Sequence, residues 1–168
     1  MNINWSMLVP GPGGIPLPTY GNYGGPGYSN GEVLSSPNQP VDYSASPVDG
    51  LDELFLFHDM AYDSPSTLVR AEGDLALIQG IEELSLNQLS PEESLYAGAA
   101  ILAAVEQLTV TNGHPELLSQ SELLAATNTS VQDIQYGLTH LEPADAIGIR
   151  AWLAQIGSGS FADLLPLG

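Results

Sequence analysis

Proline and glycine are most densely clustered in the first 46 residues, and this limits the fold more than any other feature of the sequence. The runs Pro10-Gly11-Pro12-Gly13-Gly14 and Gly24-Gly25-Pro26-Gly27 would interrupt a long helix, because proline lacks a backbone N–H and glycine is conformationally free. We therefore expect turns and loops over residues 1–46. From Ser46 onward the hydrophobic pattern is helical. The sequence predicts a mainly α protein with an irregular, Gly/Pro-rich N-terminal third.

Two long antiparallel helices are predicted directly after this segment. Ser46 is expected to cap the first, with Pro47 at its first position and Asp49 in its first turn. The run 63–66 should end this helix, and the second should extend from about Thr67 to Leu84. The apolar face of the first helix comprises Leu51, Leu54, Phe55, His58, Ala61 and Tyr62, and the buried stripe of the second comprises Leu77, Ile78, Ile81 and Leu84.

The C-terminal half shows further helical signals. Ser90-Pro91-Glu92-Glu93 forms a capping box that opens a helix, which Asn112-Gly113 should close. A short helix is expected over 115–126, another after a cap at Ser130, and a last one over 143–156 that ends at Gly157. We expect the tail through Gly168 to be mobile. The helix after Ser130 should turn four residues inward: Val131, Ile134, Leu138 and Leu141.

Charge excludes several classes of partner. The 168 residues contain 20 acids and only two cations, Arg70 and Arg150, which gives a net charge of −18. No basic face for nucleic acid can be built from this composition, and electrostatic adsorption to anionic bilayers is excluded too. The chain has no cysteine, so we expect neither disulfides nor a thiolate metal site. We also expect no N-terminal signal peptide and no transmembrane segment, since the apolar stretch 95–105 is short.

His58 and Asp59 are the first candidates for chemistry. His58 lies on the apolar helix face, where a packed core histidine is the common alternative to a catalytic one. Asp59 projects about 100° further around the helix, so the two side chains would face adjacent spaces. One space could hold a water molecule to be deprotonated, and the other a cation. Asp52 lies seven residues earlier on the face of Asp59, either as a support or as a solvated acid.

The glycine-rich run Tyr23-Gly24-Gly25-Pro26-Gly27 could supply further oxygen ligands. Calcium takes six to eight oxygens, and backbone carbonyls are common donors. A tight curl would let the alternate carbonyls of Tyr23, Gly25 and Gly27 face inward. The alternative is an ordinary turn.

Asp74 is predicted to lie beside His58. In a helical hairpin centred on residue 66, His58 is eight residues before the turn and Asp74 eight after it, so the two share a height. A carboxylate in an apolar interface is costly unless paired, and a bond to the second imidazole nitrogen would satisfy it. Glu72 and Asp63 compete for this role, but both are expected to face solvent.

Together these residues resemble the secreted phospholipase A2 superfamily. The run Pro47-Val48-Asp49-Gly50-Leu51-Asp52, followed by His58-Asp59, Tyr62 and Asp63, is similar to the active-site helix of that family. The glycine-rich run resembles its calcium loop, and the Gly-Pro-Gly form is most similar to the disulfide-free phospholipase domain of parvovirus capsids. The resemblance covers roughly residues 20–84. Residues 28–46 would form an insertion beside the site.

This resemblance implies a role for each matching position. His58 would be the general base for attack of water on the sn-2 ester of a glycerophospholipid, and Asp74 would orient it with Tyr62 as hydrogen-bond partner. Gly25 would donate its N–H to the oxyanion. Calcium would be the cofactor, held by Asp59 and by the carbonyls of Tyr23, Gly25 and Gly27.

The resemblance also bears on organisation and setting. Residues 1–90 would form the catalytic core, and residues 91–168 a helical extension packed on the same domain. The implied partners are phospholipid aggregates or the surface of a membrane, and the implied setting is extracellular, where calcium is abundant. Two alternatives stay open: a catalytically silent module that binds calcium or lipid, and an all-helical interaction protein, which residues 90–157 alone would support.

Overall fold

A computed structural model describes residues 2–11, 15–36, 39–84 and 89–155 of the chain. It confirms a mainly α protein. Gly157 and the tail through Gly168, expected to be mobile, lie outside the described residues. The elements in chain order are β1 (Ile3–Pro10), β2 (Pro16–Tyr20), β3 (Tyr28–Ser29), β4 (Glu32–Val33), α1 (Gly50–Tyr62), α2 (Thr67–Glu83), α3 (Pro91–Glu106), the π-helical turn η2 (Gln107–Thr111), the 3-10 turn η3 (Pro115–Leu117), α4 (Gln120–His140) and α5 (Pro143–Gln155).

The expectation of an irregular N-terminal third was wrong, because this part contains a β-hairpin. Strands β1 and β2 pair antiparallel, with Ile3 opposite Tyr20 and Val9 opposite Leu17. Ile3, Val9 and Tyr20 are buried. Among the described residues this sheet has two strands, so each has one edge without a partner strand there. Edge strands tolerate the missing N–H of proline. Pro10, Pro16 and Pro18 therefore lie within the strands of a short sheet.

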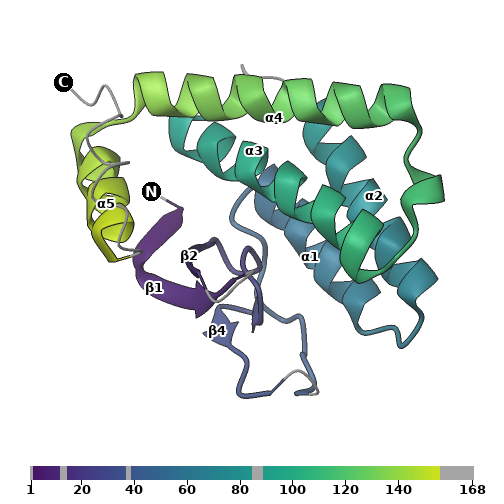
Figure 1. Ribbon diagram of the computed structural model, residues 1–168. Coiled ribbons are helices and arrows are strands. Elements are labelled where there is room, and N and C mark those ends of the chain that lie inside the picture. Colours follow the sequence, from purple (N-terminus) through teal and green to yellow (C-terminus); the bar gives the residue numbers. More distant parts are fainter. Residues whose placement is uncertain (1, 12–14, 37–38, 85–88, 156–168) are drawn as a thin grey trace.

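Helices α1 and α2 form the predicted hairpin and lie side by side in Figure 1. The cap of α1 differs from the prediction, because Asp49 rather than Ser46 accepts the N–H of Asp52, at 2.9 Å. Glycines let the helices approach closely: a Cβ on Gly73 would lie 2.5 Å from Ala61 Cβ, and one on Gly80 2.5 Å from Leu54 Cδ2. The two pairs, Gly73 with Ala61 and Gly80 with Leu54, have the same sum of residue numbers, as expected for two antiparallel helices.

Helices α3 and α4 pack against each other, and α4 crosses above both α3 and α2 in Figure 1. The capping box of Ser90 and Glu93 is confirmed. The prediction of separate helices over 115–126 and 130–141 was wrong, because a second capping box of Ser119 and Glu122 starts one helix of 21 residues. Ser130 lies inside that helix, where its hydroxyl donates to the carbonyl of Gly98 at 2.8 Å.

The buried face of α4 also differs from the prediction. Val131 is 51% exposed, and Ile134, Leu138 and Leu141 are only partly buried. The buried residues of α4 are small or polar: Ala126, Ser130, Asp133 and Gly137. A Cβ on Gly98 of α3 would lie 2.6 Å from the carbonyl oxygen of Ser130, so close packing has replaced a hydrophobic stripe as the basis of this contact.

One described segment, Pro91–Thr111, is long and apolar enough to cross a bilayer by length and composition, with a mean hydropathy of 1.2 over its best window. Core helices of water-soluble domains have the same properties. Here the segment packs between α4 and α2 and buries Ile101, Ala104 and Leu108. Helix α5 completes the described chain beside β1. Trp5 and Trp152 contact each other there, with ring centroids 6.5 Å apart and ring planes tilted by 49°.

Candidate active site

The predicted contact between His58 and Asp74 is present across the α1–α2 hairpin. His58 Nε2 lies 2.8 Å from Asp74 Oδ1, and the hydroxyl of Tyr62 donates to the same oxygen at 2.9 Å. An ionised carboxylate can only accept hydrogen bonds. Nε2 therefore carries the imidazole proton, and Nδ1 of neutral His58 is free to accept one. Asp74 is fully buried, whereas 15% of the His58 side chain is exposed.

The competing acids occupy other places. Glu72 and Asp63 are exposed, as expected from the sequence, and Asp63 Oδ2 accepts the hydroxyl of Tyr43 at 2.8 Å. His58 is therefore oriented by Asp74 alone among the three candidates.

Two further residues complete this cluster, and no sequence pattern indicated that they would contact it. Asn112 Nδ2 donates to Asp74 Oδ2 at 2.7 Å and contacts the hydroxyl oxygen of Tyr62 at 2.9 Å. The side-chain amide of Gln107 also contacts that hydroxyl. Both residues come from the π-helical turn η2 and its end, 45 and 50 residues after Tyr62, the last residue of α1. A π-helical turn shifts the backbone hydrogen bonds by one residue relative to an α-helix. A hydrophobic pattern in the sequence does not show this shift.

Asp52 serves as a support for the glycine-rich run. Its buried carboxylate accepts the N–H groups of Asn22, Tyr23 and Val48 at 2.9–3.1 Å. Burial raises the pKa of Asp52, and these three backbone donors oppose the rise. The chain before the glycines is thereby fastened to the first turn of α1. The sequence left two roles open for Asp52, a support or a solvated acid, and its burial excludes the solvated acid.

The glycine-rich run follows a curled path beside α1. Gly25 and Gly27 have φ angles of 145° and 63°, which glycine adopts easily and other residues rarely do. The carbonyl of Gly25 accepts the N–H of Tyr28 at 3.1 Å, and that of Gly27 accepts the N–H of Leu34 at 2.8 Å. Each carbonyl oxygen has two lone pairs, so each retains capacity for one further partner.

Asp59 is the least satisfied acid of the site. Burial raises its pKa to about 7, and the nearby Ser29 hydroxyl offsets part of this rise. Neither Asp59 Oδ2 nor Ser29 Oγ completes a hydrogen bond within the described residues. A buried oxygen without a partner costs free energy. Asp59 is therefore a buried acid with one oxygen that lacks a hydrogen-bond partner among the described residues.

A single cavity of about 830 Å³ unites these residues. Tyr23, Gly25, Gly27, His58 and Asp59 all line it. The cation site expected from the sequence thus faces the same space as the expected base. Among the described residues, no group of three His, Cys, Asp or Glu side chains could hold a metal.

The rest of the cavity wall is mostly apolar. Helix α3 contributes Leu95, Ala99 and Ala103 to this wall. The N-terminal hairpin and α5 contribute larger side chains, among them Leu17, Ile149 and Trp152. Residues of the 28–46 segment, such as Leu34, Val41 and Tyr43, close one side. Arg70, one of two cations in the chain, also lines the cavity, and its Nε has no hydrogen-bond partner among the described residues.

Comparison of this chain with models of protein families, with curated proteins and with solved structures gives no match in any of the three. The assignment of a function therefore depends on the geometry of the site and on the motifs quoted above.

Proposed function

We propose that the protein is a calcium-dependent phospholipase A2 that hydrolyses the sn-2 ester of glycerophospholipids at the surface of a membrane or lipid aggregate. His58 is the general base, and Asp74 with Tyr62 orients it. Asp59 and the carbonyls of Tyr23, Gly25 and Gly27 hold calcium. The proposed setting is extracellular, where calcium is available to a site built largely from carbonyls.

One observation carries the proposal. The imidazole with a buried carboxylate behind it and the acid with an unpartnered buried oxygen line one cavity, together with the glycine-rich run. A core histidine requires none of these neighbours. An all-helical interaction protein would have no reason to keep Asp59 buried without a partner.

The roles follow from the contacts. Nδ1 of His58 takes a proton from the attacking water, and the imidazolium that forms is stabilised through Nε2 by Asp74. The N–H of Gly25 donates to the oxygen on which negative charge develops. Calcium, when bound, supplies polarisation of the ester carbonyl and stabilises that negative charge. The apolar wall of the cavity suits acyl chains, and Arg70 suits a phosphate-bearing head group.

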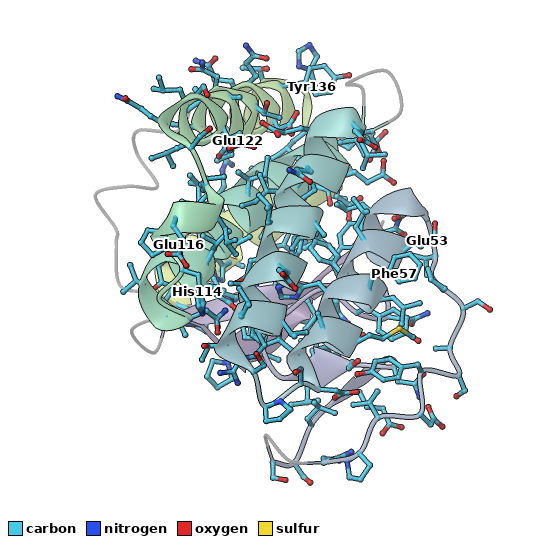
Figure 2. The ribbon with its side chains drawn as sticks, turned by 90° about the vertical axis from the view of Figure 1, so that its right-hand side faces the viewer. Glu53, Phe57, His114, Glu116, Glu122 and Tyr136 are labelled. Carbon is cyan, nitrogen blue, oxygen red and sulfur yellow. The ribbon has the colours of Figure 1, made fainter. Side chains whose placement is uncertain are left out.

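The proposal is tested by fatty-acid release from mixed micelles of a phospholipid that carries different acyl chains at sn-1 and sn-2. We expect release of the sn-2 chain with calcium and none with a chelator. The matched control is Glu53→Gln, which removes one charge from the outer side of α1, where Figure 2 shows Glu53 pointing away from the core. This variant should retain wild-type turnover.

Two results would contradict the proposal. Calcium could raise the melting temperature without any ester cleavage, which would identify a silent binding module. The protein could also respond neither in stability nor in activity, which would favour a helical interaction protein.

A further inference from the structure

Asn112, at the end of the π-helical turn η2, holds the carboxylate that orients His58. Asp74 offers two carboxylate oxygens, and His58 and Tyr62 both use Oδ1. The second oxygen, Oδ2, accepts only from Asn112 Nδ2 among the hydrogen bonds of the described residues, at 2.7 Å. Asp74 is fully buried and Asn112 is 6% exposed. Without this amide, a buried carboxylate oxygen would have no donor.

The local backbone explains how Asn112 reaches this place. In an α-helix, residues five apart project about 140° from each other, so Gln107 and Asn112 could not reach the same hydroxyl. The π-type bond from Asn112 N to Gln107 O, at 2.7 Å, brings them nearly into line. Both side chains then contact Tyr62. π-helical turns of this kind are frequent at functional sites.

The segment that carries Asn112 is anchored on both sides. Leu108 is fully buried within the turn. After it, His114 Nε2 is hydrogen-bonded to Thr67 Oγ1 at the start of α2, at 3.1 Å, and His114 Nδ1 to Glu116 at 2.8 Å. Figure 2 shows His114 and Glu116 together at this end of the molecule. The position of the Asn112 amide is therefore fixed relative to α2, the helix that bears Asp74.

We infer that Asn112 is a positioning residue of the site: its amide holds Asp74 at the second oxygen, and through Asp74 it fixes the tautomer and orientation of His58. The expected effect of Asn112 on kcat rests on the proposed function, whereas its expected effect on the tautomer of His58 does not. A carboxylate bound at both oxygens cannot rotate about its terminal bond. The Nε2–H of His58 then keeps its acceptor, and Nδ1 stays available as the base.

The test replaces Asn112 by leucine, which has nearly the same shape but no donor. Imidazole nitrogen chemical shifts report the tautomer of each of the three histidines at one pH at which all are neutral. We expect the wild-type His58 to be almost entirely the Nε2–H form and Asn112→Leu to populate the other tautomer severalfold more. In the assay of fatty-acid release from phospholipid micelles, kcat should fall about tenfold or more with little change of KM.

Two controls separate positioning from loss of folding. Leu108→Ala leaves a cavity in the same turn but removes no bond to Asp74, so it should lower the melting temperature without shifting the His58 tautomer. In the wild-type protein, which requires no variant to fold, the side-chain amide protons of Asn112 should exchange with solvent far more slowly than those of the exposed Asn128.

The inference is overturned if Asn112→Leu folds and leaves the His58 tautomer unchanged, if Leu108→Ala shifts the tautomer equally, or if the Asn112 and Asn128 amides exchange at similar rates. These readouts contain no substrate. A wild-type protein with the expected tautomer and no lipid hydrolysis would therefore refute the proposed function alone.

Discussion

The two sides of the candidate site differ in how far they are complete without a ligand. On the histidine side (His58, Asp74, Tyr62 and Asn112), both carboxylate oxygens of Asp74 have hydrogen-bond partners. On the calcium side (residues 23–27 and Asp59), a buried carboxylate oxygen has none among the described residues. The same helix, α1, carries both His58 and Asp59. Under the proposed function, the base is assembled without a ligand, whereas Asp59 lacks a partner that a bound cation would supply.

The largest effect is expected from His58→Gln, which removes the base and leaves the calcium side intact. General bases contribute about 10²–10⁴-fold, so we expect turnover to fall about 10³-fold. Calcium binding, followed by calorimetry, should be unchanged. Full activity of this variant would show that the histidine side has no catalytic role.

The next effect concerns pH and calcium. The pKa of Asp59 rises from an ordinary 3.8 to about 7 on folding. A carboxyl with a raised folded pKa contributes most stability below its unfolded pKa, and this contribution is lost as the pH rises through about 7. In chelator, thermal unfolding should therefore show lower stability at pH 8 than at pH 4, by at most about 4 kcal/mol from this group. Calcium should restore the loss.

Asp59→Asn should abolish both the Asp59 part of that pH dependence and the calcium response, and weaken calcium binding at least about tenfold. The matched control is Asp133, another buried acid, whose pKa burial raises to about 6. Asp133→Asn should also reduce the pH dependence but leave the calcium-induced rise in melting temperature unchanged. If calcium raised the melting temperature of both variants equally, Asp59 would have no special role in binding calcium.

A smaller effect is expected from Asp52→Asn, which changes the support of the calcium side without touching the cavity. The amide would turn one donor toward the N–H groups of Asn22, Tyr23 or Val48, and an unsatisfied buried group costs about 1–3 kcal/mol. We expect lower stability in urea together with weaker calcium binding. Stability lost with calcium affinity unchanged would mean that Asp52 does not hold the glycine-rich run in place.

The smallest effect should come from the packing of the hairpin. Gly73→Ala places a Cβ against Ala61, at a cost of about 1–3 kcal/mol, of which better helix propensity returns about 1 kcal/mol. Gly80→Ala meets only the movable end of Leu54 and should cost less. Because Gly73 adjoins Asp74, its substitution should lower kcat more than that of Gly80. A larger loss of kcat in Gly80→Ala than in Gly73→Ala would show that the helix spacing at Gly73 does not affect catalysis.

Sequence patterns predicted the local parts of this molecule better than the distant ones. His58, Asp74 and Tyr62 could be placed together because one tight turn fixes the register of α1 and α2. The β1–β2 hairpin was missed because prolines at strand edges look the same as prolines in loops. Asn112 could not be predicted, since its place depends on a π-helical turn and on tertiary contacts of η2 with α2.

The most direct test of the account is a crystal structure determined with bound calcium, in which anomalous scattering locates the ion. We predict one ion bound by the Asp59 carboxylate and the carbonyl oxygens of Tyr23, Gly25 and Gly27, at about 2.3–2.6 Å, in the cavity that His58 lines. An ion bound elsewhere, or a glycine-rich run whose carbonyls turn away from Asp59 at saturating calcium, would contradict it.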